Sequence, residues 1–175
     1  MNWKTKQLVL TALFAALTCV ATMVIRIPVP STGGYIHPGD ALVIFCGIFL
    51  GPVNGFLAAG IGSGMADLFG GYFIYIPATF LIKGVIAALT ALIYQRVKPL
   101  PKGHILGVVL GGIVDTLFVA GGYFIFEYFF YGWGAAASIP ANIVQGISGL
   151  VIALVLSPAL SALPAGVLSE KLHQH

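Results

Sequence analysis

Six polar side chains stand inside or at the ends of long apolar runs, where ionisable groups are costly to bury in lipid. They are Asp40, Asp67, Lys83, Glu127, Asn142 and Gln145. Carboxylates, a lysine and amides can hydrogen-bond the edge of a small polar ring, and tyrosines can stack on its faces. Their chemistry therefore indicates recognition of a small aromatic molecule.

The same inventory lacks the parts of a catalytic centre. Gly60-Ile-Gly-Ser-Gly64 places Ser63 in an apolar run, but every histidine lies outside the predicted helical interiors, so this serine has no evident base. His-Glu-x-x-His, Gly-x-Ser-x-Gly and Walker A motifs are absent from the sequence. We predict no catalytic residue, no metal site and no cofactor, so uphill transport would draw energy from a partner or an ion gradient.

The composition excludes a soluble protein. Of 175 residues, 59% are hydrophobic and 7% charged, whereas a soluble domain carries about a quarter charged residues. A helical span takes roughly 20 apolar residues, so we predict an all-α integral membrane protein, a six-transmembrane-helix bundle forming a single membrane domain over residues 1–175. The expected helices are 3–27, 40–50, 52–68, 77–96, 104–130 and 138–160, with Gly51-Pro52 as a tight break inside a close hairpin.

The basic residues predict the orientation, because positive charge favours the cytoplasmic side of short loops. With both termini cytoplasmic, that side receives Lys4, Lys6, Arg96, Lys98, Lys102 and Lys171. Arg26 then lies outside, next to the longest outer loop, residues 28–39. The net charge of +3 is explained by this topology and does not indicate nucleic-acid binding.

This orientation brings the polar residues to one depth near the outer surface. With a rise of 1.5 Å per residue, Lys83 lies roughly 9 Å and Glu127 roughly 5 Å below the outer ends of their helices. Asn142 and Gln145 share one helix face. The predicted substrate-binding residues are Tyr35, His37, Asp40, Asp67, Tyr75, Lys83, Glu127, Asn142 and Gln145.

Structural interpretations of the charged residues stay open. Lys83 and Glu127 can neutralise each other as a buried ion pair, contact the ligand, or do both. Asp40 can be a helix N-cap and Asp67 a turn residue beside a Gly-Gly pair. Asp115 lies near the midplane without an evident partner, so we expect it to be protonated or bonded to a neighbouring helix.

The uncharged residues have alternatives as well. Asn142 and Gln145 can bond between helices, His37 can be a solvated loop residue, and Tyr75, like Tyr72, can be an interfacial aromatic.

Several short motifs in a fixed order resemble the substrate-binding (S) components of energy-coupling factor (ECF) vitamin transporters, in the riboflavin-transporter-like group that includes hydroxymethylpyrimidine and pyridoxine types. Each motif is weak alone, and their order and spacing over about 120 residues carry the resemblance. They are Ile27-Pro-Val-Pro30, Gly34-Tyr-Ile-His-Pro-Gly-Asp40, Phe49-Leu-Gly-Pro52, Gly60-Ile-Gly-Ser-Gly-Met-Ala-Asp67, Tyr75-Ile-Pro-Ala-Thr79, Ile82-Lys-Gly84 and Pro140-Ala-Asn-Ile-Val-Gln145.

The resemblance implies a six-helix vitamin-binding subunit in the bacterial plasma membrane, without ATPase activity of its own. It implies a transmembrane coupling (T) protein and two cytoplasmic ATP-binding subunits as partners, docked on an Ala-x-x-x-Ala face that stands here as Ala12 and Ala16. It also implies that the first outer loop covers the pocket and that the whole subunit reorients to deliver the vitamin.

One departure concerns the ligand. Related sequences often carry Asn-Leu-Gly-Asp where this chain has His37-Pro38-Gly39-Asp40, and the pocket residues suit a small polar ring. We therefore expect pyridoxine or hydroxymethylpyrimidine rather than riboflavin. The alternatives are an S component for riboflavin or another vitamin, a stand-alone ion-coupled secondary transporter, and a scaffold protein that binds no ligand.

Overall fold

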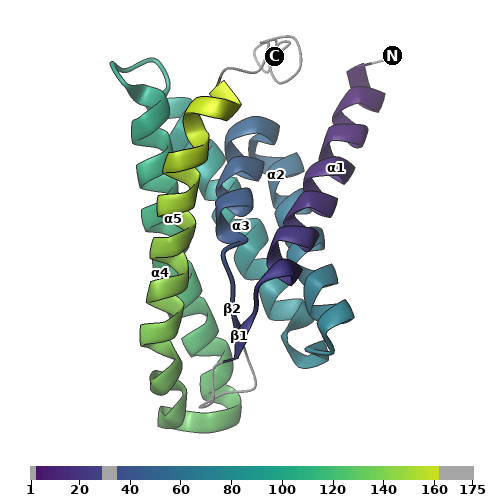
Figure 1. Cartoon of the computed structure of the whole chain (residues 1–175), viewed down its shortest axis with the longest axis vertical. Coiled ribbons are helices and arrows are strands. Elements are labelled where there is room, and N and C mark those ends of the chain that lie inside the picture. The colour runs from purple at the N-terminus through teal and green to yellow at the C-terminus, as the bar shows by residue number, and fades with distance from the viewer. Residues whose placement is uncertain (1–2, 29–34, 162–175) are drawn as a thin grey trace.

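The computed structural model describes residues 3–28 and 35–161, which are almost entirely helical (Figure 1). Residues 29–34 of the expected outer loop and Lys171 lie outside the described residues. The elements are α1 (Trp3–Val24), β1 (Ile27–Pro28), β2 (Tyr35–Ile36), α2 (Asp40–Gly70), the short 3-10 helix η1 (Phe73–Tyr75), α3 (Ile76–Val97), α4 (Gly103–Tyr131), the 3-10 helix η2 (Gly132–Ser138) and α5 (Ile139–Ser161).

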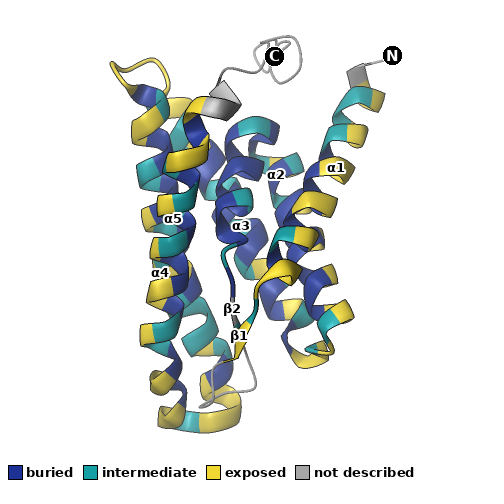
Figure 2. Cartoon of the chain, in the orientation of Figure 1, coloured by how far each residue is buried: buried dark blue, intermediate teal, exposed yellow. Residues whose placement is uncertain are grey.

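The outer surface of this bundle, exposed in Figure 2, is apolar, unlike that of a soluble protein. Large apolar side chains face outward, among them Phe129, which is 80% exposed, and Val155, which is 72% exposed. Asp40, Lys83 and Asp115 have no exposed surface. Four described helical stretches are long and apolar enough to cross a membrane. A surface of this kind is stable against hydrocarbon and would aggregate in water.

The helix α2 turns back on itself at Gly51. The backbone there has φ 77° and ψ −177°, a conformation outside the helical region that is essentially restricted to glycine, and Pro52 follows it. A Cβ added to Gly55 would lie 2.8 Å from the carbonyl oxygen of Cys46. Residues nine apart in a continuous helix are far more distant, so the two halves of α2 lie side by side. The predicted break at Gly51-Pro52 and the close hairpin are both confirmed.

Glycines allow the helices to approach closely. A Cβ on Gly47 would lie 2.3 Å from the Ala87 carbonyl oxygen, and one on Gly62 would lie 2.4 Å from the Ala15 carbonyl oxygen. Backbones this close maximise van der Waals contact, which holds helices together where lipid removes the hydrophobic driving force. The first half of α2 is thereby pressed against α3, and the second half against α1.

Ala12 and Ala16 point away from these contacts. Both are exposed on α1, whereas Ala15 is buried and faces Gly62. The resemblance to S components implies that Ala12 and Ala16 form a docking face. The structure assigns Ala15 to internal packing and leaves Ala12 and Ala16 on the lipid-facing side.

The two ends of the bundle differ (Figure 1). The start of α1, the end of α5 and the α3–α4 turn lie at one end, and β1, β2, η1 and η2 lie toward the other. The strands pair antiparallel, Ile27 with Ile36 and Pro28 with Tyr35, an element that the sequence analysis did not predict. This small ladder holds the segment that carries Tyr35 and His37 against the bundle.

Replacing Gly51 by alanine tests the reversal of α2. Because a Cβ is strained in this backbone conformation, we expect Gly51→Ala to lower the free energy of unfolding by about 1–3 kcal/mol, measured as denaturation in detergent. Gly121→Ala is the matched control, since a Cβ there meets nothing within 4 Å and alanine favours helix by up to about 1 kcal/mol. Equal stability of the two variants would contradict the strained turn.

Candidate binding site

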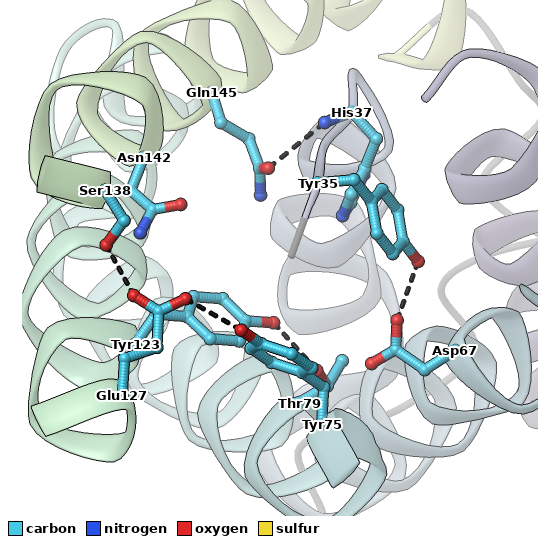
Figure 3. Close-up of a pocket in the computed structure, with 10 residues that line it drawn as sticks. All are labelled: Tyr35, His37, Asp67, Tyr75, Thr79, Tyr123, Glu127, Ser138, Asn142 and Gln145. Carbon is cyan, nitrogen blue, oxygen red and sulfur yellow. Dashed lines mark hydrogen bonds between the residues drawn. The ribbon is translucent and has the colours of Figure 1, made fainter. Parts of the chain in front are cut away.

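A cavity lies among α2, α3, α4 and α5, at the end of the bundle that carries the ladder (Figure 3). The volume open to the centres of water-sized molecules is about 30 Å³, so the cavity is small. The lining residues are Tyr35, His37, Asp67, Tyr75, Thr79, Tyr123, Glu127, Ser138, Asn142 and Gln145. All of the predicted binding residues except Asp40 and Lys83 are in this lining.

Tyr35 of β2 connects the ladder to α2. Its hydroxyl donates to Asp67 Oδ1 at 2.7 Å, and its ring lies 4.4 Å from that of Tyr72, centroid to centroid. The Arg26 guanidinium lies over the same Tyr35 ring, 5.1 Å from its centroid. It also donates a hydrogen bond to the Ala66 carbonyl at 3.1 Å. Burial, and then the Asp67 carboxylate, raise the pKa of Tyr35 well above its ordinary value, so the phenol is a hydrogen-bond donor at neutral pH.

His37 is buried and neutral, contrary to the alternative of a solvated loop residue. Burial lowers the pKa of its ring to about 4, despite the opposing effect of the Asp40 carboxylate. Its Nδ1 accepts from the Gly39 amide at 3.0 Å, so the ring proton is assigned to Nε2. Its backbone amide donates to Gln145 Oε1 at 3.1 Å. This hydrogen bond attaches the segment between β2 and α2 to α5.

Lys83 pairs with Asp40, and both side chains are completely buried. The Asp40 carboxylate also accepts from Gln145 Nε2 at 2.8 Å, and His37 Nε2 lies 4.0 Å from it. Of the alternatives left open for Lys83, the ion pair with Glu127 is therefore wrong. The N-cap interpretation of Asp40 is also wrong, because Gly39 holds that position and the carboxylate is bonded across the bundle. The Lys83–Asp40 pair does not line the cavity, whereas Gln145 both lines the cavity and bonds Asp40.

Glu127 is satisfied by two hydroxyl groups instead. Tyr75 donates to Oε1 at 3.1 Å and Ser138 to Oε2 at 2.5 Å. Beside them, the hydroxyl groups of Thr79 and Tyr123 are 2.9 Å apart. This wall of the cavity, built from α3, α4 and η2, presents aromatic rings and hydroxyl groups in a fixed network (Figure 3).

Three lining residues were missed by sequence reasoning: Thr79, Tyr123 and Ser138. Each stands four positions before a predicted residue of the same run, namely Lys83, Glu127 and Asn142. Residues at this spacing share a helix face. The signal was therefore present, but hydroxyl residues are common enough on helices in lipid that they did not stand out.

The two amides on α5 have different roles. Gln145 is engaged by His37 and Asp40, as the inter-helix alternative expected. Asn142 is buried and points into the cavity (Figure 3). It makes no hydrogen bond to the other residues drawn in that figure. An amide both donates and accepts, so Asn142 is available to a ligand edge.

Asp67 combines a turn role with a place in the cavity. Its backbone carbonyl accepts from the Gly71 and Tyr72 amides at the end of α2, as the turn interpretation expected. Its side chain is 3% exposed and lines the cavity.

Asp115 is completely buried below this region. Neither of its carboxyl oxygens has a hydrogen-bond partner within the described part of the chain, so the expected bond to a neighbouring helix is not observed there. The charged groups that act on it are Asp40 and Lys83. Two carboxyl groups thus share the neighbourhood of a single lysine.

This arrangement can bind a small polar ring reversibly. Aromatic rings, hydroxyl groups, one available amide and two carboxyl groups line a small cavity. Residues 3–28 and 35–161 contain no cluster of three or more His, Cys, Asp or Glu able to hold a metal. A lipid-facing helical bundle with such a cavity at one end defines a membrane protein that binds a small molecule.

The family follows from comparison with known proteins. Residues 2–162 match the family described as ECF-type riboflavin transporter, S component, and the chain belongs to this family. Its members are membrane-embedded transporter components that bind small vitamins and work with T and ATPase modules, and they are not enzymes.

Three similar proteins place the chain within the family. The thiamine precursor transporter HmpT of Lactococcus lactis subsp. cremoris (strain MG1363) is 32% identical over 165 residues, covering 91% of this chain and 90% of that protein. An uncharacterized protein of Pyrococcus woesei is 37% identical over 134 residues, 76% of this chain and 86% of that protein. The solved S component of a bacterial ECF transporter has the same fold, with a TM-score of 0.65 at 21% identity, covering 90% of this chain and 96% of that one.

Removing Lys83 tests the buried pair. Because Asp40 would be left as an uncompensated buried charge, we expect Lys83→Met to lower the free energy of unfolding in detergent by about 3–5 kcal/mol. Lys98→Met, at an exposed lysine after the same helix, should change it little. The double variant Asp40→Asn/Lys83→Met should recover much of the loss. If Lys83→Met were no worse than Lys98→Met, the pair would not stabilise the bundle.

Proposed function

We propose that this chain is the high-affinity binding subunit of an ECF-type importer for a hydroxymethylpyrimidine-type vitamin precursor. The observation that carries the proposal is the small cavity lined by aromatic rings, hydroxyl groups and the Asn142 amide. The similarity to HmpT, named as a thiamine precursor transporter, supports a small ring over a flavin. Nothing in the comparisons points to pyridoxine.

The proposed topology has six membrane-crossing segments, counting the two halves of α2 separately, with both termini cytoplasmic. In support, Arg96, Lys98 and Lys102 lie at the end of the bundle where α1 begins and α5 ends. The cavity lies toward the opposite end, which would face outward in the plasma membrane. The bacterial source expected from the sequence stays a prediction.

The proposed partners are a T protein and two cytoplasmic ATP-binding subunits. The ATP-binding subunits would use ATP and so supply the energy for transport. The exposed Ala12 and Ala16 on α1 support a docking face, since small residues let a partner helix approach closely.

A stand-alone ion-coupled transporter is the second candidate, and Asp115 is the observation that favours it. A buried carboxyl group without a hydrogen-bond partner among the described residues is a plausible proton carrier. Membership of the S-component family favours the first candidate, which requires partner subunits for uptake.

Ligand binding by the purified protein is the decisive test. We expect native mass spectrometry to detect one bound small aromatic molecule, and titration to show tight binding of hydroxymethylpyrimidine. Asn142→Ala should weaken binding about tenfold or more, because the ligand loses its amide partner. Ser148→Ala is the control on the same helix, since its hydroxyl bonds the Val144 carbonyl. Tight binding of riboflavin with no pyrimidine binding would instead support the flavin alternative.

Enlarging the α1 face tests the docking proposal. Overpacking of a fitted surface costs about 1–3 kcal/mol, so Ala16→Leu should weaken association with the T protein about 5- to 100-fold while ligand affinity stays unchanged. Co-purification with the T and ATP-binding subunits measures the first quantity and titration the second. Val155→Leu, at a lipid-facing residue of α5, is the control. Unchanged co-purification of Ala16→Leu would rule out this docking face.

A further inference from the structure

One oxygen of Asp67 is buried at the cavity wall without a hydrogen bond. Oδ1 accepts from the Tyr35 hydroxyl at 2.7 Å, whereas Oδ2 is buried and has no partner among the described residues. Figure 3 shows this second oxygen turned toward the cavity. A buried acceptor left unpaired is costly, by an amount comparable to a lost hydrogen bond or more. The site is therefore incomplete at this point and suited to a donor.

The neighbouring groups do not supply that donor. The Thr79 hydroxyl is hydrogen-bonded to Tyr123 and lies close enough to act on the Asp67 carboxyl, yet neither it nor any other described donor meets Asp67 Oδ2 with hydrogen-bond geometry. Arg26, on the other side, is directed to the Ala66 carbonyl and the Tyr35 ring. The cavity lining holds two carboxyl groups, Asp67 and Glu127, and neither lysine nor arginine.

The rest of the lining distinguishes Asp67 from the other acceptors. Both oxygens of Glu127 accept from hydroxyl groups of the protein, and Gln145 Oε1 accepts from the His37 amide. Asp67 Oδ2 is thus the charged acceptor in the described lining that is left for a ligand. Across the cavity in Figure 3 lies Asn142, which can both donate and accept.

We propose that Asp67 is a specificity-determining residue that selects ligands carrying an amino group, which donates a hydrogen bond to Asp67 Oδ2. This inference rests on the proposed function and narrows its ligand class to amino-substituted heteroaromatic rings. An oxo group at the same ring position would direct a lone pair at the carboxylate and would leave both acceptors unsatisfied. Sites built to bond one such group reject its counterpart strongly, because their buried polar atoms are then unpaired.

The test compares two probes: amino-bearing hydroxymethylpyrimidine and its oxo analogue, in which a carbonyl replaces the amino group and a neighbouring ring nitrogen carries a hydrogen. We expect the wild-type protein to prefer the amino probe about 10- to 100-fold, the factor of a hydrogen bond to a charged group. Equal affinity, or preference for the oxo probe, would overturn the assignment while leaving the binding function in place. Binding of neither probe would overturn both the assignment and the proposed ligand.

The variant Asp67→Asn tests whether the preference for the amino probe over the oxo probe can be reversed. An asparagine amide can donate to the oxo group, and its carbonyl can still accept from Tyr35. The variant should therefore lose affinity for the amino probe and gain affinity for the oxo probe, with Ser148→Ala keeping the wild-type ratio. An equal loss for both probes would identify Asp67 as merely structural. The wild-type comparison alone decides the matter if Asp67→Asn does not fold.

Discussion

The buried contact between Lys83 and Asp40 is the constraint on which the arrangement of the bundle depends. Neither charge has any exposed surface, and outside the bundle is hydrocarbon, where a lone charge is costly. The start of α2 must therefore stay beside the middle of α3. Gln145 attaches α5 to the same carboxylate, and the His37 amide attaches the loop after β2 to Gln145. Three segments that are far apart in the sequence, namely residues 37–40, α3 and α5, are thus fixed around one carboxylate.

In this arrangement most of the buried charged and amide groups are satisfied by the protein itself, including two that line the cavity, Glu127 and Gln145. Lys83 and Asp40 satisfy each other behind the wall, and Gln145 is engaged on both of its polar atoms. Glu127 is likewise bonded on both oxygens by Tyr75 and Ser138. What remains for a ligand is a set of aromatic faces, the Asn142 amide and one oxygen of Asp67. Preorganised partners of this kind reduce the ordering that binding requires.

The sequence predicts much of this fold because a membrane allows few alternatives. Apolar runs and the Gly51-Pro52 pair gave the helical segments and the reversal of α2, and the fixed rise of a helix placed the polar residues at one depth. Depth alone does not determine which residues pair, because several polar groups share it. An ion pair between Lys83 and Glu127 was therefore one of the alternatives, whereas the observed partner of Lys83 is Asp40. The β1–β2 ladder was missed because strands of two residues carry no periodicity.

The sequence predicts part of the cavity lining as well. Charged and amide side chains in an apolar run are rare and draw attention, which identified Asp67, Glu127 and Asn142. Thr79, Tyr123 and Ser138 carry hydroxyl groups, which are ordinary in such helices, so only the three-dimensional packing reveals them. Because the Lys83–Asp40 pair is satisfied behind the wall, uncharged lining residues such as Thr79 and Asn142 can be exchanged singly without exposing that pair. The scaffold can therefore change its ligand one lining residue at a time, which makes it readily evolvable.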